Sequence, residues 1–297
     1  MWFPLSLFTI AAWAGSDFFS KRGTRPNDKY SHLRLVISVG TVMTIHAVAY
    51  LLITGIEWKL SYIILYLPVS FLYILSMTLG YAGLRYIELS VSSPICNSSG
   101  AVTSILVFVF LGQTMELMQL GGVIMITAGV ILLAVIDKKM AEKSKTLSED
   151  DTKYRRSAIA ILFPILYCII DGLGTFADAY FLEHVLDEAS ANIAYEFTFG
   201  ICALISYLYM RVIKKEKFSY IKEKQFTIGA VCETAGQFTY IFALGDNAIV
   251  AAPLIASYSV FSVILSRIFL KEKLSRTQYA VIALIMVGIA ILGAFDN

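Results

Sequence analysis

The sequence has few charged residues and none of the common motifs of a soluble enzyme. Only 15% of the 297 residues are charged, whereas soluble domains carry about 25%, which argues against a soluble domain. No basic stripe interleaved with aromatic residues is present, so we expect no nucleic-acid partner. The sequence also lacks a histidine–acid metal motif, a nucleophile beside a base and a phosphate-cradling glycine loop. We therefore expect no catalytic residue, no bound metal and no cofactor, and the chain is not expected to be an enzyme.

Cysteine is scarce as well. The four cysteines, Cys96, Cys168, Cys202 and Cys232, all lie in apolar blocks, and their spacing matches no metal site. We interpret them as small buried residues.

Long apolar segments dominate the chain. Hydrophobic residues make up 58% of the sequence and form blocks separated by short charged segments. A helix needs about 20 apolar residues to cross a bilayer, and the fold class we predict is an all-α integral membrane protein with ten transmembrane helices. These are expected at 2–20, 33–55, 62–84, 91–111, 118–136, 157–180, 190–212, 226–244, 248–269 and 276–295. Pro94 and Pro253 are expected in the first turn of their helices, where proline is tolerated.

An internal repeat divides the chain. Residues 81–136 align without a gap on residues 240–295, with matches of Tyr81 to Tyr240, Pro94 to Pro253, Ser98 to Ser257, Gln119 to Gln278 and Gly129 to Gly288. We predict two five-helix repeats, residues 1–137 and 157–297, joined by a charged cytoplasmic linker, residues 138–156. Because five is odd, the repeats must have opposite orientations, an arrangement that places a transporter's substrate site near the midplane.

The basic residues predict the orientation. Of the 24 lysines and arginines, all but Lys59 lie in or beside the odd-numbered loops. The positive-inside rule puts those loops in the cytoplasm and both termini outside. We expect a multi-pass protein of the cell membrane, plasma or inner, embedded in the lipid bilayer.

Several residues carry a resemblance to a known family. The run from Phe269 to Ser275, followed by Gln278 and Gly288, is similar to the signature between the fourth and fifth helices of EamA-type members of the drug/metabolite transporter superfamily. The first half has the related run Phe110 to Thr114, with Gln113 where the second half keeps the acidic Glu272. The resemblance covers nearly the whole chain and implies a carrier or exporter of amino acids, metabolites, drugs or nucleotide-linked compounds. Such proteins usually have both termini in the cytoplasm, so the charge distribution here departs from the family.

Two aspartates in equivalent helices are the first candidates for a substrate site. Asp17 follows Trp13 by one turn, and Asp171 follows Tyr167 by one turn. An aromatic ring beside a carboxylate suits an amine-bearing substrate, through charge pairing and cation–π contact. The alternative is that one or both acids lie near a helix end and are simply solvated.

A third candidate group lies on one face of the helix expected at 226–244. Glu233, Gln237 and Tyr240 are spaced by four and three residues, and therefore project from one side. We favour a cavity wall that contacts substrate. The alternative is an interhelical hydrogen-bond clamp.

The remaining candidates are single residues in other spans. Glu196 is an acid within the helix expected at 190–212, and we expect it to contact substrate. We expect the same of Asn97 and Tyr258, which follow the two equivalent prolines. An ionisable residue within a membrane span is a functional candidate by default. For proton coupling the candidates are Asp171, Glu233 and His46, the last because histidine titrates near neutral pH; its alternative is a packing role.

We predict a secondary transporter, a carrier or exporter of a small metabolite that is amine-bearing or amino-acid-like. No ATP-binding motif is present, so exchange or an ion gradient, such as a proton gradient, would drive alternating access. A flippase for a lipid-linked substrate and a non-transporting membrane protein are the alternatives. Ten spans can form one pathway, so a monomer or a homodimer fits.

Overall fold

The computed structural model describes residues 1–25, 27–87, 89–145, 162–271 and 274–294, and every regular element in those ranges is helical. The first half contains α1 (Trp2–Gly23), α2 (Ser31–Thr54), α3 (Ser61–Leu65), α4 (Leu67–Gly83), α5 (Leu89–Asn97), α6 (Ser99–Leu106), the π-helical turn η1 (Val107–Leu111) and α7 (Leu117–Lys145). The second half contains α9 (Leu162–His184), α10 (Glu188–Leu208), η2 (Tyr209–Ile213), α11 (Lys224–Ala256), α12 (Tyr258–Leu265), η3 (Ser266–Leu270) and α13 (Arg276–Ala294).

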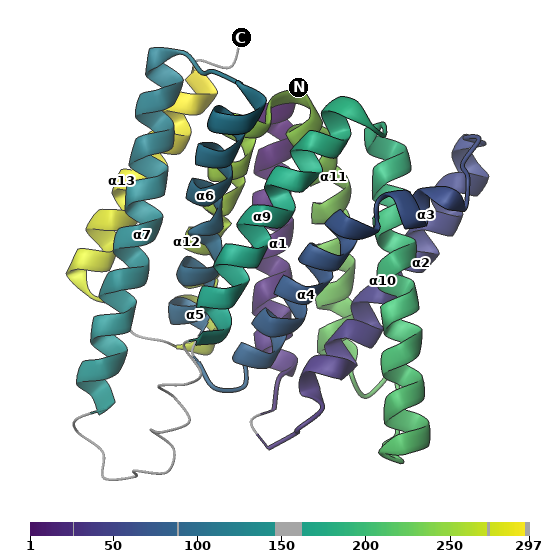
Figure 1. Ribbon diagram of the computed structural model, residues 1–297. Helices are drawn as coiled ribbons and strands as arrows, with labels where there is room; N and C mark the ends of the chain where they lie inside the picture. Colours follow the sequence, from purple (N-terminus) through teal and green to yellow (C-terminus); the bar gives the residue numbers. More distant parts are fainter. Residues whose placement is uncertain (26, 88, 146–161, 272–273, 295–297) are drawn as a thin grey trace.

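Six helical stretches of the described chain are long and apolar enough to cross a membrane, and two shorter apolar helices, Leu67–Gly83 and Arg276–Leu292, accompany them. One of the six, Lys224–Leu270, leaves helical geometry at Asn247, which has φ −158° and ψ 81°. The chain rises along α11 to this point and then descends along α12 (Figure 1). A single continuous stretch therefore contains the two predicted helices 226–244 and 248–269. The count of ten spans stays a prediction.

The chain direction differs between the two halves. From the N-terminus at the top of Figure 1, α1 descends, whereas α9, the first described helix of the second half, ascends. The start of α1 and the end of α13 lie at the top, and the connections after α1, α4 and η2 lie at the bottom. The two halves are inverted relative to each other in this arrangement.

The backbone repeats at the offset found in the sequence. The offset that aligns residues 81–136 with 240–295 also aligns α6 with α12 and η1 with η3, residue for residue. The two elements end alike, because Gly112 and Lys271 both adopt a left-handed conformation, with φ of 65° and 61°. The internal repeat is thus present in the backbone as well as in the side chains.

The two prolines do not lie where the sequence predicts. Pro94 lies inside α5 and Pro253 inside α11, each beyond the first turn. A proline within a helix removes a hydrogen bond and crowds the preceding turn, and both helices break four residues later, at Ser98 and Ser257. At each break the backbone N–H turns to the carbonyl three residues back: Ser98 to Ile95 at 3.3 Å, and Ser257 to Leu254 at 3.0 Å. The spans predicted at 91–111 and 248–269 are therefore broken in the middle.

Helix ends also differ from the predicted ones. α7 continues to Lys145, so the first part of the predicted linker 138–156 is helical; the rest, and the start of the helix predicted at 157–180, lie outside the described residues. Lysines can extend a helix beyond the hydrocarbon because their stems stay in contact with it while their charges reach water.

Pairs of helices from opposite halves form the core. α1 packs against α11, α2 against α10, α4 against α9 and α7 against α13. Glycine permits the last pairing: a Cβ at Gly129 would lie 2.3 Å from Ile285, and one at Gly288 would lie 3.0 Å from the Gly122 carbonyl oxygen. Small residues let membrane helices approach closely, so α7 of the first half and α13 of the second half pack tightly against each other.

Candidate functional site: a cavity between the two halves

A cavity of about 90 Å³ lies between the two halves. By this measure one water molecule needs roughly 10–15 Å³, so the cavity has room for several waters or a small organic molecule. Its walls come from α1, α4, α5, α6, α9, α10, α11 and α12. Seven aromatic side chains line it: Trp13, Tyr73, Tyr81, Tyr167, Tyr195, Tyr240 and Tyr258.

Asp17 lies on one side of this cavity and is bound by serines of both halves. The Ser93 hydroxyl donates to its Oδ2 at 2.7 Å, and the Ser262 hydroxyl donates to the same oxygen at 2.9 Å. Ser93 comes from α5 and Ser262 from α12. The residue as a whole is half-buried, and it lines the cavity. Asp17 is therefore oriented by the protein and open to the cavity.

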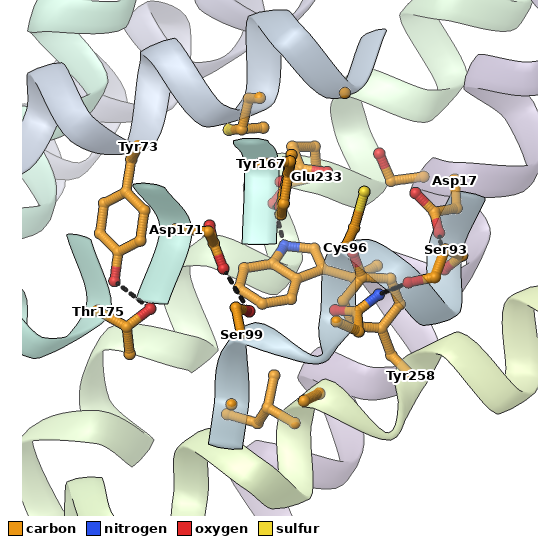
Figure 2. Close-up of a pocket in the computed structure, with 18 of the residues that line it drawn as sticks. Asp17, Tyr73, Ser93, Cys96, Ser99, Tyr167, Asp171, Thr175, Glu233 and Tyr258 are labelled. Carbon is orange, nitrogen blue, oxygen red and sulfur yellow. Dashed lines mark hydrogen bonds between the residues drawn. The ribbon is translucent and has the colours of Figure 1, made fainter. Parts of the chain in front are cut away.

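Asp171 lies on the opposite side in Figure 2 and has an analogous environment. The Ser99 hydroxyl of α6 donates to Oδ2 at 2.8 Å, and the Ser76 hydroxyl of α4 donates to Oδ1 at 3.3 Å. The neighbouring Gly172 permits this, because a Cβ there would lie 3.2 Å from the Ser99 carbonyl oxygen and would separate α9 from α6. Asp17 is therefore held by two serine hydroxyl groups, and Asp171 by two serine hydroxyl groups and Tyr167, and neither aspartate lies at a helix end.

The predicted face of α11 also points into the cavity. Glu233, Gln237 and Tyr240 all line it. Trp13 packs close to this helix, and its Nε1 donates to the Glu233 carbonyl oxygen at 3.4 Å. Tyr240 combines both predicted roles, because it lines the cavity and its hydroxyl also bonds the Tyr73 hydroxyl of α4. The cavity wall and the interhelical clamp are thus features of the same helix face.

The breaks at Ser98 and Ser257 place two more candidates in the wall. Asn97 lines the cavity and donates from Nδ2 to the Ser93 carbonyl oxygen at 2.8 Å. Tyr258 also lines it, and its ring meets the Trp13 ring edge-on with centroids 5.6 Å apart. Asn97 is the last residue of α5, and Tyr258 is the first residue of α12. The mid-span breaks therefore place both residues at the cavity wall.

Glu196 and His46 lie elsewhere. The Glu196 carboxylate is fully buried between α10 and α2, 2.8 Å from His46 Nδ1, and it accepts a hydrogen bond from Asn192 Nδ2 at 3.1 Å. Neither Glu196 nor His46 lines the cavity. The structure therefore does not support substrate contact by Glu196 in this cavity. The N-cap of α10 is Asp187, whose side chain accepts a hydrogen bond from the Ser190 N–H at 2.8 Å.

The sequence does not predict a cluster of hydroxyl groups that surrounds Asp178 beside the cavity. The buried Asp178 accepts hydrogen bonds from the Tyr66 hydroxyl and, at 3.1 Å, from the Tyr73 hydroxyl. Asp178 follows Asp171 by two helical turns and projects from the same face of α9. This spacing is the feature of the sequence that could have indicated Asp178 as a further candidate. Its tyrosine partners on α4 carry no comparable signal in the sequence.

The charge in the cavity wall has one sign. Among the described residues that line it, Asp17, Asp171 and Glu233 are acidic, and none is lysine, arginine or histidine. In addition, the buried Tyr81 hydroxyl has no hydrogen-bond partner within the described part of the chain. Buried polar groups are costly without partners, so this wall offers unused hydrogen-bonding groups next to three carboxylates.

The comparisons with known proteins agree with this architecture. The sequence matches the EamA-like transporter family over residues 1–135 and 158–294. The chain belongs to this family. It is therefore a multi-pass membrane protein of a transporter family in the drug/metabolite superfamily.

A solved structure titled only "Crystal structure of protein" matches this EamA-like chain with a TM-score of 0.63 at 15% identity, covering 97% of each chain. That similarity concerns the fold alone. No curated protein matches the sequence.

Proposed function

We propose that this protein is a secondary transporter that exchanges a small amine-bearing cation for protons by alternating access. The observation that carries the proposal is the cavity between the inverted halves, whose described lining has three carboxylates and no basic side chain. A carboxylate within a membrane span is costly and is retained for a partner. In such a cavity a proton and an ammonium group are competing partners of the same acid.

The aromatic lining supports the same class of substrate. The faces of tryptophan and tyrosine rings attract ammonium groups, by about 0.5–1 kcal/mol when exposed and about 2 kcal/mol or more when desolvated. Trp13 stands one turn before Asp17, and Tyr167 one turn before Asp171. A zwitterionic amino acid is a poorer match, because the described wall has no cation to pair with its carboxylate.

The inverted halves support alternating access. Inverted repeats place a binding site at their interface and move against each other around it. We propose the division into repeats 1–137 and 157–297, with 138–156 as the linker, as the two moving units. We also place Asp171 and Glu233 in proton coupling. His46 lies outside the cavity, and its contact with Glu196 supports a packing role.

The test is transport by purified protein in liposomes with an imposed pH gradient. We expect radiolabelled small amines to accumulate inside when the lumen is acidic, at an initial rate that collapses when a protonophore removes the gradient. Organic anions and neutral amino acids should remain at the level of protein-free liposomes. Movement of anions alone would contradict the role of the three carboxylates, and movement of a fluorescent lipid in their place would favour the flippase.

We also propose that the basic loops face the cytoplasm, because the lysines and arginines concentrate there. Lys214 and Lys59 are both exposed, and we expect them on opposite sides of the membrane. Each is replaced by cysteine in a separate variant. In intact cells a membrane-impermeant thiol reagent should label Lys59→Cys and spare Lys214→Cys, each compared with the unsubstituted protein. The reverse pattern would restore the orientation usual in the family.

A further inference from the structure

We infer that the substrate is a linear diamine, with one ammonium group held by Asp17 and the other by Asp171. This inference rests on the proposed amine–proton exchange and goes beyond it, because a single ammonium group needs only one carboxylate. Figure 2 shows the two aspartates on opposite sides of the cavity, with Glu233 between them in this view.

The two aspartates form two separate sites rather than one coupled pair. Asp17 is held by Ser93 and Ser262, and Asp171 by Ser99 and Ser76, with no hydroxyl shared between them. An ionised carboxylate has about four acceptor positions. Two serine hydroxyls occupy two of them at Asp17 and leave about two for the N–H groups of an ammonium ion. At Asp171 Tyr167 is a third partner beside the two serines, which leaves about one.

Each aspartate has an aromatic residue one turn earlier on its own helix, and both rings line the cavity. Trp13 precedes Asp17 on α1, and Tyr167 precedes Asp171 on α9. The Trp13 ring is in turn packed against Tyr240 and Tyr258, with centroids 5.0 Å and 5.6 Å away. The cavity wall is therefore rich in aromatic rings, whose faces suit a methylene chain as well as the ammonium groups at its ends.

The charge balance of the exchange follows from this geometry. When a diamine with two positive charges enters, Asp17 and Asp171 each release one proton and each pair with one ammonium group. Two protons leave for every diamine bound, and the net charge of the cavity is unchanged. A monoamine displaces one proton and leaves the second aspartate protonated. Glu233, which lines the same cavity, pairs with neither ammonium group and keeps its proposed role in proton coupling as the acid that relays the released protons.

The experiment compares putrescine with n-butylamine, which has the same carbon chain and a single amine. In the proteoliposome assay we expect the KM for putrescine to be at least tenfold below that for n-butylamine. A proton-to-substrate ratio of two for putrescine and one for n-butylamine is expected from pH-sensitive dye and radiolabel measured together. The variants Asp17→Asn and Asp171→Asn should each raise the putrescine KM to that of n-butylamine while n-butylamine uptake persists through the remaining aspartate.

The control is Asp246→Asn, which removes an exposed carboxylate that pairs with the N-terminal amine at 2.6 Å, outside the cavity. It should keep the full preference for putrescine. Equal KM values for the two amines in the unsubstituted protein would overturn the diamine inference and leave amine exchange standing. Failure to move either amine would overturn the proposed function itself. Measurements on the unsubstituted protein alone therefore distinguish failure of the diamine inference from failure of the proposed function, even where a variant does not fold.

Discussion

Buried carboxylates of this protein occur in two different environments. Glu196, between α2 and α10, is fully buried, lies 2.8 Å from His46 Nδ1 and accepts a hydrogen bond from Asn192. Asp17 and Asp171, at the interface of the halves, are half-buried residues that line the cavity and accept hydrogen bonds from serine hydroxyl groups. One environment contains a partner that can carry positive charge, and the other provides only neutral donors.

The difference indicates which acids are available to a substrate. A buried charge needs a partner, because desolvation costs several kcal/mol per ion. His46 is such a partner for Glu196 within the protein. Among the described residues that line the cavity no basic side chain can do the same for the aspartates. We propose that their partner arrives from solution, as a proton or as a cation.

The largest expected effect comes from neutralising the cavity acids. Asp171→Asn should lower putrescine uptake, as kcat/KM, by about thirtyfold or more, since losing one member of a buried charge pair costs about 2–5 kcal/mol of binding. Glu233→Gln should lower proton-driven amine uptake, because it removes a carboxyl group that we place in proton coupling. Uptake is measured in proteoliposomes at equal protein content. Both variants should fold normally, because an amide keeps the shape of the group it replaces and removes a buried charge. Full activity in both variants would remove the distinction between the two environments.

The Glu196 environment should respond in the opposite way. His46→Leu leaves Glu196 buried without its ring partner, and breaking a buried ion pair costs about 3–5 kcal/mol of stability. We expect a lower thermal midpoint in detergent and an unchanged KM for the amine. Replacing both residues, as His46→Leu with Glu196→Leu, should recover part of the lost stability. A changed KM with unchanged stability would assign this pair to transport after all.

Most of the candidate site was predictable from the sequence, for a physical reason. Polar residues in apolar helices are conspicuous, and helical periodicity shows which of them share a face. All the residues predicted to contact substrate line the cavity except Glu196. Glu196 looks the same as the others in the sequence, because its partner, His46, lies 150 positions away on another helix.

Other features were not predictable because they depend on contacts between helices. Serine is common in membrane helices, so nothing in the sequence distinguishes Ser93, Ser99 and Ser262, which bind the aspartates, from serines that bond their own helix. The predicted positions of Pro94 and Pro253 were wrong because each proline is the sixth residue of its helical segment, beyond the first turn, and each segment breaks at the serine four residues later. The repeat itself was found because its glycines and prolines recur at one offset.

A further test concerns the packing of α2 on α10, the helices that carry His46 and Glu196. A Cβ at Gly40 would lie 2.4 Å from the Phe199 carbonyl oxygen, whereas one at Gly121 on α7 would meet nothing within 4 Å. Gly40→Ala should therefore lower stability by about 1–3 kcal/mol. Gly121→Ala should be neutral or slightly stabilising, because alanine is favoured over glycine in helices. Thermal unfolding in detergent measures both, and equal midpoints would contradict the close approach of α2 and α10.

The smallest expected effect separates a serine that holds an aspartate from one that does not. On α12, the Ser262 hydroxyl donates to Asp17 at 2.9 Å, whereas the Ser259 hydroxyl donates to the Ala256 carbonyl oxygen at 3.2 Å. Both residues are fully buried. An interhelical hydrogen bond in a membrane contributes about 0.6 kcal/mol, so Ser262→Ala should raise the amine KM about threefold. Ser259→Ala should leave it unchanged. If the two variants behave alike, Ser262 does not orient Asp17 for the substrate, and the aspartate is positioned by Ser93 and by α1 itself.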